Sequence, residues 1–249
     1  MKHFINIKDV PYKTLRKILS DTKKRKDLRK KLKTLEIDKD NPLKGILLIQ
    51  MFEKSSLRTR LSFYLAIRQL GGSALTLRPD ELHLSKGGES LSDTAKILST
   101  YGDIFVLRTD NEKKLNSFKK FLSIPLINGL SPNSHPAQIL SDIFTIEEIT
   151  KKNISRLNIC WIGDSNNVLN SLIEASIKFS FKLNIGCPKN YNPPSEMLRM
   201  IRQKSSKIKI FNNPKVAIKN ADVVLTDKVI SMNDKVNKKK KIKDFLNFR

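Results

Sequence analysis

Residues 45–67 read G-I-L-L-I-Q-M-F-E-K-S-S-L-R-T-R-L-S-F-Y-L-A-I, a pattern that predicts a strand, a polar turn and a helix. The turn carries hydroxyl and guanidinium groups at the point where a helix leaves its first backbone N–H groups unpaired. Those groups and the helix dipole attract an anion, and Arg58 adds a planar fork that fits phosphate or carboxylate. An ordinary capped helix with surface arginines gives the same pattern, so this segment alone leaves both interpretations open.

The rest of the chain repeats the alternation of apolar strands and helices. We predict strands at 73–77, 103–107, 124–128, 157–162, 182–186, 207–211 and 223–225. We predict helices in 9–33, from 92, at 111–122, 135–148, 167–179 and 194–203, and a short one after Pro214. This alternation is typical of βαβ units, and the composition changes at 151–153. We therefore predict an α/β protein of two domains, 1–150 and 151–249, each a parallel β-sheet flanked by helices.

Polar residues follow several of the predicted strands. Arg108, Asn167 and Asp227 all fall close behind a strand end. In open parallel sheets, ligands bind beyond the carboxyl ends of the strands. We therefore expect an active site in a cleft between the two domains.

Composition excludes some classes of protein. The 249 residues are 39% hydrophobic, and no apolar run approaches the ~20 residues that a membrane helix needs. Residues 1–6 lack the apolar core of a signal peptide. Cys160 and Cys187 lie in apolar strand-like contexts, which indicates two buried thiols in a reducing compartment. We therefore expect a cytoplasmic protein without a membrane partner.

The formal net charge of +24 is unusually high, and a strongly basic chain raises the question of nucleic-acid binding. The cations concentrate at 23–26, 29–31 and 238–241, but there is no zinc-finger spacing and little aromatic interleaving. We interpret most of this charge as solvated helix faces, and we expect no nucleic-acid partner. The resulting positive field favours the approach of anionic substrates.

Five motifs occur in one order along the chain: F-E-K-S-S-L-R-T-R-L-S-F, G-E-S-L-S-D-T-A, H-P-A-Q-I-L-S-D, G-D-S-N-N-V-L-N-S and T-D-K-V-I-S-M. That order resembles the aspartate/ornithine carbamoyltransferase family, and the last two motifs are similar to the ornithine branch. The resemblance runs from about residue 9 to about residue 233. It implies a first domain that binds carbamoyl phosphate and a second that binds an amine substrate, with no metal and no organic cofactor.

The resemblance assigns the carbamoyl phosphate site residue by residue. The phosphate loop is Ser56, Leu57, Arg58 and Thr59. Arg108 bridges the phosphate and the carbonyl oxygen, and His135 and Gln138 contact the carbamoyl group. The catalytic residues are Arg108, His135 and Thr59. The family usually has threonine where this chain has Leu57, which removes one hydroxyl donor.

The ornithine-holding residues implied by the resemblance are Asn167, Asp227, Ser231 and Met232. Lys228 and Asn233 replace a tryptophan and a glycine that are common in this stretch. His83 lies in a loop that, in family trimers, reaches the neighbouring subunit's site, and it could equally be a solvated loop histidine. We therefore expect a homotrimer.

The expected reaction transfers the carbamoyl group of carbamoyl phosphate to the side-chain amine of L-ornithine, giving L-citrulline and phosphate for arginine biosynthesis. Family chains continue past the position of Arg249 with a His-Cys-Leu-Pro motif and a closing helix. We therefore expect a truncated member that binds carbamoyl phosphate better than it turns it over. The alternatives are a catalytically impaired remnant that binds carbamoyl phosphate, a carbamoyltransferase with another amine acceptor, and, more weakly, a basic nucleic-acid-binding protein.

Overall fold

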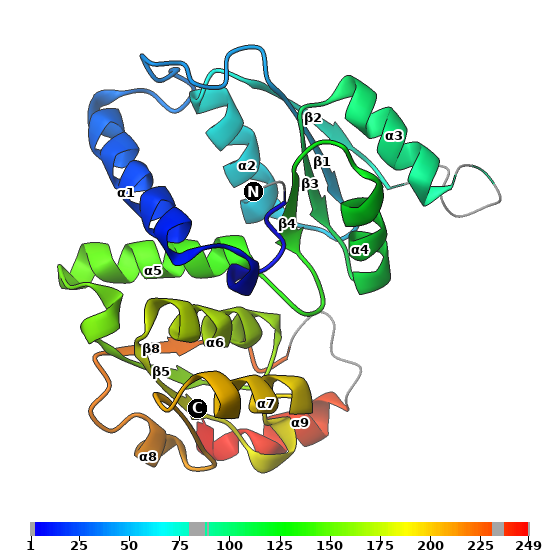
Figure 1. The fold of residues 1–249 in the computed structure, drawn as a ribbon. Helices are drawn as coiled ribbons and strands as arrows, with labels where there is room; N and C mark the ends of the chain where they lie inside the picture. Colours follow the sequence, from blue (N-terminus) through cyan, green and yellow to red (C-terminus); the bar gives the residue numbers. More distant parts are fainter. Residues whose placement is uncertain (1–2, 80–87, 89, 231–236, 249) are drawn as a thin grey trace. The chain divides into compact units, whose positions relative to one another are not determined.

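The computed structural model describes residues 3–79, 88, 90–230 and 237–248. The chain divides into two compact units, Met1–Ala137 and Gln138–Arg249 (Figure 1). Each unit is an α/β fold built on its own four-stranded parallel sheet. The predicted fold class is confirmed.

The first unit holds a sheet in the order β2-β1-β3-β4. Its strands are β1 (Leu47–Phe52), β2 (Ser73–Leu77), β3 (Ile104–Arg108) and β4 (Leu126–Leu130). Its helices are α1 (Tyr12–Leu28), α2 (Leu57–Gln69), α3 (Leu91–Tyr101) and α4 (Glu112–Phe121). All three strand pairs are parallel, and the register places Phe52 beside Arg108. The carboxyl ends of β1 and β3 are therefore neighbours.

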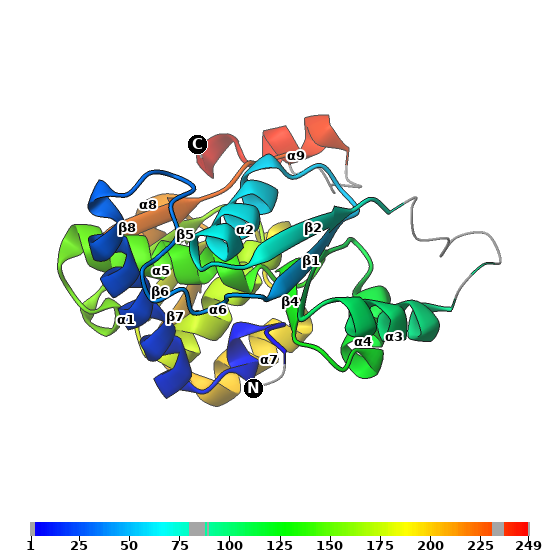
Figure 2. The same ribbon diagram turned by 90° about the horizontal axis from the view of Figure 1, so that it is seen from above.

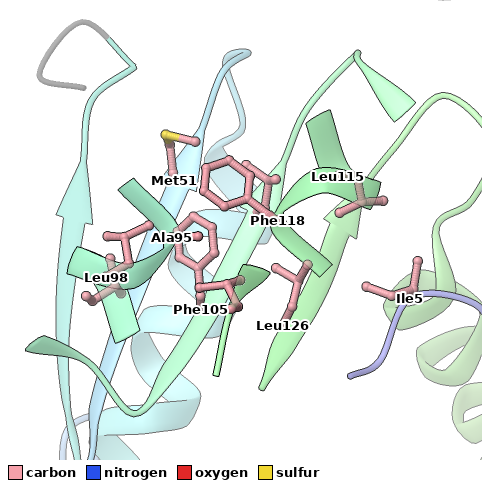
Figure 3. Packing of buried hydrophobic residues seen from close by; sticks show 11 residues of the cluster. Ile5, Met51, Ala95, Leu98, Phe105, Leu115, Phe118 and Leu126 are labelled. Atoms are coloured by element: carbon pink, nitrogen blue, oxygen red, sulfur yellow. The ribbon is translucent and has the colours of Figure 1, made fainter. Parts of the chain in front are cut away.

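Both faces of this first sheet are covered. The larger apolar cluster joins alternate strand residues such as Met51 and Phe105 to α3 and α4, and the Phe105 and Phe118 rings lie 5.4 Å apart (Figure 3). A second cluster joins Leu48 and Val106 to Ile67 of α2. Because neighbouring strand residues point to opposite faces, α2 covers one face, and α3 and α4 cover the other (Figure 2).

The second unit repeats the plan with a sheet in the order β7-β6-β5-β8. Its strands are β5 (Asn158–Ile162), β6 (Lys182–Gly186), β7 (Ile208–Phe211) and β8 (Val223–Thr226). Its helices are α6 (Asn167–Phe179), α7 (Ser195–Lys204), α8 (Pro214–Ala217) and α9 (Lys238–Asp244). Helix α5 (Pro136–Thr150) starts at the end of the first unit and runs into the second. β5 is central, so the loop after it lies between the ends of β6 and β8.

The predicted strands and helices are present with shifts of at most a few residues, and α9 is an α-helix of the described ranges that the sequence pattern did not predict. Cys160 and Cys187 are free and buried, as expected. Within the described ranges, no helix has the length and apolarity needed to cross a membrane.

Candidate functional site

The start of α2 is built to accept an anion. Ser56 is the N-cap residue, but its side chain does not cap the helix, and no acidic residue lies in the first turn. The first N–H groups of the helix therefore keep their capacity to bind a ligand. Arg58 is exposed and forms no hydrogen bond or ion pair with the part of the chain that the structure describes. Leu57 is 68% exposed and contributes no hydroxyl here.

Arg108 at the end of β3 reaches the same helix start. One terminal nitrogen of its guanidinium donates to Ser56 Oγ at 3.2 Å and to Thr59 Oγ1 at 3.4 Å. Its Nε is buried and has no hydrogen-bond partner among the described residues. Burial lowers the pKa of the Arg108 guanidinium, yet arginine keeps its charge at neutral pH. Within the described chain this cation meets hydroxyl groups and no carboxylate.

A network next to Arg108 fixes the ends of β1 and β3. The carboxylate of Glu53 accepts hydrogen bonds from the Thr109 hydroxyl and the Lys114 ammonium group. The backbone N–H of Glu53 also donates to the carbonyl of Arg108 at 3.0 Å. The Lys114–Glu53 pair is mostly buried, so its geometry is more restricted than that of a surface pair. The network holds the two chain segments that carry Ser56 and Arg108.

His135 follows β4 through a short loop and lies directly before α5. It is buried, with 8% of its surface exposed. The loop is held by Asn128, whose side-chain amide donates to the carbonyl of Ile5 at 3.1 Å and to Ser131 Oγ at 3.3 Å. Gln138, in the first turn of α5, is exposed, and its amide donates to Asp142 at 2.8 Å. Partial burial raises the pKa of the Asp142 carboxyl, and the bond from Gln138 opposes that rise.

The second unit presents polar residues at the carboxyl ends of β5 and β8. Asp227 directly follows β8, and its carboxylate accepts from Asn166 Nδ2 at 3.0 Å. The Asn166 Oδ1 in turn accepts from the N–H groups of Val168 and Leu169, both at 3.0 Å, and so caps α6. Asn167 is the first residue of that helix. The cap residue Asn166 therefore contacts one oxygen of the Asp227 carboxylate, and the other oxygen accepts from the N–H of Lys228 at 2.7 Å.

Three of the predicted site residues, His83, Ser231 and Met232, lie outside the described residues. Of the remaining nine, seven fall into two groups, whereas His135 lies directly before α5 and Gln138 lies in its first turn. Ser56, Leu57, Arg58, Thr59 and Arg108 lie together at one edge of the first sheet. Asn167 and Asp227 lie at the corresponding edge of the second sheet, on either side of Asn166. No group of three or more His, Cys, Asp or Glu side chains suited to a metal ion occurs within the described ranges.

Comparisons with known proteins agree with this geometry. The sequence model described as "Aspartate/ornithine carbamoyltransferase, carbamoyl-P binding domain" matches residues 2–148. The model described as "Aspartate/ornithine carbamoyltransferase, Asp/Orn binding domain" matches residues 155–249. The chain belongs to the aspartate/ornithine carbamoyltransferase family.

Individual members of this carbamoyltransferase family show the extent of the similarity. The ornithine carbamoyltransferase of Rhizorhabdus wittichii is 39% identical over 231 residues, which is 93% of this chain and 74% of that protein. The structure of ornithine carbamoyltransferase from Pyrococcus furiosus has a TM-score of 0.90 at 32% identity. The match covers 100% of this chain and 78% of the Pyrococcus chain. The catalytic subunit of M. jannaschii aspartate transcarbamoylase has a TM-score of 0.82 at 26% identity, and the match covers 100% of this chain and 81% of that subunit. The chain is a carbamoyltransferase.

The structure adds residues of this carbamoyltransferase that the sequence analysis missed. Glu53 and Lys114 support the first group, Asn128 holds the loop before His135, and Asn166 supports the second group. Glu53 stands inside the quoted motif, and an asparagine directly before a helix is a common N-cap signal. Lys114 gives no such signal, because its partner Glu53 lies 61 positions away in sequence.

A groove of about 690 Å³ lies at the opposite edge of the second sheet and takes no part in the site described above. It is lined by the starts of the strands, among them Asn158, Lys182 and Lys209. Parallel sheets of this type bind ligands at the carboxyl edge, where Asp227 lies. We therefore place the candidate site at the carboxyl edges and not in this groove.

Proposed function

We propose that the protein transfers the carbamoyl group of carbamoyl phosphate to the side-chain amine of L-ornithine, giving L-citrulline and phosphate. One observation carries the first half of the proposal. Arg108 is a partly buried cation whose described partners are the hydroxyl groups of Ser56 and Thr59, and its Nε has none. A buried cation without a carboxylate is costly unless an anion occupies the site. The phosphate and carbonyl oxygens of carbamoyl phosphate match that requirement.

In the proposed reaction, the neutral side-chain amine attacks the carbonyl carbon of carbamoyl phosphate. The new C–N bond forms, the C–O bond to phosphorus breaks, and the nitrogen loses a proton. Negative charge builds on the carbonyl oxygen, where Arg108, Thr59 and His135 stabilise it as hydrogen-bond donors. Phosphate leaves as an anion held by Arg58 and the N–H groups of the α2 start. The amine must be unprotonated to attack, so activity rises with pH until the amine is neutral.

Asp227 supports the choice of an amino acid as acceptor. Its exposed carboxylate is oriented by Asn166 and suits the α-ammonium group of the substrate. We assign Asn167, Ser231 and Met232 to the α-carboxylate and side chain of ornithine, and Gln138 to the carbamoyl group. We assign His83, contributed by a neighbouring subunit, to carbamoyl phosphate. We also assign the protein to arginine biosynthesis in the cytoplasm, as a homotrimer. Several relatives named ornithine carbamoyltransferase favour this acceptor over aspartate.

An acceptor screen tests the proposal. Purified protein is incubated with carbamoyl phosphate and with ornithine, aspartate, lysine or putrescine, and the carbamoylated product and phosphate are measured. We expect citrulline from ornithine and little product from the other amines. In a binding test, norvaline, which lacks the side-chain amine, should protect against thermal unfolding once carbamoyl phosphate is present. Protection by aspartate or succinate, without protection by norvaline, would contradict the ornithine assignment.

Transfer to another acceptor is the second candidate, because an aspartate transcarbamoylase subunit shares the fold with a TM-score of 0.82. A protein that binds carbamoyl phosphate without turnover is the third. The acceptor screen separates the second candidate from the first. Calorimetry with carbamoyl phosphate alone identifies the third, because binding is then retained when no acceptor gives product.

A further inference from the structure

The run Lys238–Lys241 contains one lysine that differs from its neighbours. Lys238, Lys239 and Lys240 are exposed, whereas Lys241 is 1% exposed. Its ammonium group donates to Asp164 Oδ2 at 2.5 Å, and Asp164 is itself 8% exposed. A lysine is rarely buried unless it is paired, because removing its charge from water is costly. Lys241 and Asp164 therefore form a buried ion pair, unlike the three exposed lysines before it.

The face of α9 that carries Lys241 makes three more contacts, all with Tyr191. The carboxylate of Asp244 accepts from the Tyr191 hydroxyl at 3.0 Å, and the Phe245 ring lies 4.9 Å from the Tyr191 ring in a T-shaped arrangement. The Lys241 ammonium group also lies 5.8 Å from the centre of the Tyr191 ring. Residues three and four positions apart share one face of a helix, so α9 contacts Asp164 and Tyr191 together.

Asp164 and Tyr191 both hold the loop that follows β5. The Tyr191 carbonyl accepts from the N–H of Ser165 at 3.0 Å, and the Asp164 carbonyl accepts from Trp161 Nε1 at 3.1 Å. Gly163 begins this loop with φ of 157°, a value that other residues rarely adopt. The loop ends at Asn166, which caps α6 and donates to Asp227. A short segment held by these hydrogen bonds therefore connects Lys241 to the carboxylate assigned to the amine substrate.

We infer that Lys241 and Asp164 are positioning residues for the second substrate, acting through the 163–166 loop on Asn166 and Asp227. The inference rests on the proposed function and adds to it two residues that do not contact either substrate. In low-dielectric surroundings each charge of the pair requires the other close by, so the contact restricts where the loop can lie relative to α9. A small displacement of Asp227 would weaken its bond to the substrate ammonium and misalign the attacking amine.

Single substitutions measure the effect on each substrate. We expect Lys241→Met to raise KM for ornithine by roughly one to two orders of magnitude. The Kd of carbamoyl phosphate should stay within about twofold of its original value, which corresponds to RT ln 2, or roughly 0.4 kcal/mol. The matched control is Lys240→Met, the exposed neighbour in the same run, which should leave both constants unchanged. Lys241→Arg keeps the charge and should recover much of the loss. An unchanged KM for ornithine in Lys241→Met, or an equal change for both substrates, would overturn the inference.

A double variant separates positioning from stability. Breaking a buried ion pair from one side destabilises the fold, whereas replacing both partners is often close to neutral. We therefore expect the Asp164→Asn/Lys241→Met variant to regain most of the Tm lost in either single variant, while KM for ornithine stays high. Recovery of both the Tm and KM would assign the pair a structural role and contradict the inference. If Lys241→Met does not fold, Tyr191→Phe removes only the hydrogen bond from Tyr191 to Asp244. We then expect KM for ornithine to rise while the Kd of carbamoyl phosphate stays unchanged.

The acceptor assay of the unsubstituted protein tests the proposed function separately from the role of Lys241. If that protein carbamoylates aspartate and not ornithine, the proposed function fails. The same variants are then assayed with aspartate as acceptor. The change in KM for aspartate, compared between Lys241→Met and Lys240→Met, still tests the role of Lys241.

Discussion

At the scale of single residues, the candidate site depends on how a few charged groups are held. Arg108 keeps its charge in a partly buried position and directs it at the start of α2. Glu53 lies on the adjacent strand end, but its carboxylate is engaged by Thr109 and Lys114. The Glu53 carboxylate is thus engaged by other groups, and the guanidinium of Arg108 can meet an incoming anion.

Replacing Arg108 tests that assignment directly. We expect Arg108→Ala to weaken carbamoyl phosphate binding by about 1.5–3 kcal/mol or more, because a charged hydrogen bond to the ligand is lost. Arg108→Lys should recover only part of the loss, since an ammonium group lacks the planar fork. Calorimetry on the two variants and on Arg60→Ala, an exposed arginine of α2, provides the comparison. Equal affinity in Arg108→Ala and the unsubstituted protein would rule the assignment out.

Lys114 offers a test of indirect support. Lys114→Met leaves the Glu53 carboxylate without its cation, so the carboxylate becomes a competitor for Arg108 and for the phosphate. We expect KM for carbamoyl phosphate to rise severalfold, with the far-ultraviolet circular dichroism spectrum unchanged. Lys113→Met, at the exposed neighbouring position, is the control. If both variants behave alike, the Glu53–Lys114 pair has no part in positioning Arg108.

Cys187 provides a prediction about pH. Burial, and then the negative charge of Asp164, raise the pKa of its thiol to about 12 from an ordinary value of 9.0. The folded state therefore binds the thiol proton more tightly than the unfolded state, so the stabilising contribution is complete below pH 9 and is lost as the pH rises toward 12. We expect slow alkylation of the native thiol at pH 8 and fast alkylation in denaturant. Rapid native alkylation of Cys187, with Cys187→Ala as the blank, would show that the thiol is accessible.

At the scale of secondary-structure elements, a single substitution at the start of α2 is expected to increase its affinity for phosphate. Leu57 is 68% exposed, so its side chain adds little to the core, and a threonine there would place a hydroxyl beside the bound phosphate. We expect Leu57→Thr to tighten binding of a phosphate analogue by about 1 kcal/mol. Leu57→Val, which has a similar shape without the hydroxyl, is the matched control. Tightening by both variants would mean that side-chain size, and not the hydroxyl, is responsible.

The elements themselves could be read from the sequence because their patterns are local. The alternation of apolar strands and amphipathic helices predicted β1 to β8 and both parallel sheets. Helix α9 escaped prediction because its lysine run is polar at almost every position. The residue that makes it a packed helix, Lys241, is paired with Asp164, 77 positions earlier. A pairing at that distance is invisible to any rule that considers neighbouring residues.

The site shows the same limit. Motifs predicted Arg108 and Asp227 as site residues, and the structure places them at the end of β3 and directly after β8. The motif assigned Asn167 to the substrate and gave no role to Asn166, although both stand in the same polar turn. The role of Asn166 depends on where α6 begins, and the structure gives it the cap position and a bond to Asp227.

At the scale of the whole molecule, the net charge of +24 is the dominant feature. A positive field raises the encounter rate with a charged phosphate ester and is screened by salt, with a Debye length of about 10 Å at 0.1 M. We expect kcat/KM for carbamoyl phosphate to fall steeply as sodium chloride is raised from 10 to 500 mM. The corresponding value for the acceptor, which carries little net negative charge, should change much less. Equal salt sensitivity for both substrates would show that the field does not steer carbamoyl phosphate.

The strand order has a consequence for how the chain is made. All four strands of the first sheet have been synthesised once Leu130 is added, so that sheet can close early. In the second sheet, β5 is central, and its partner β8 comes last: Asn158 and Asp222 bond to each other from positions 64 apart. A ribosome adds about 5–20 residues per second, so one edge of β5 stays unpaired for several seconds of translation. Nascent chains carry this unpaired strand edge until β8 emerges. During that interval the edge can pair with another chain, so a chaperone that covers it has its largest effect then.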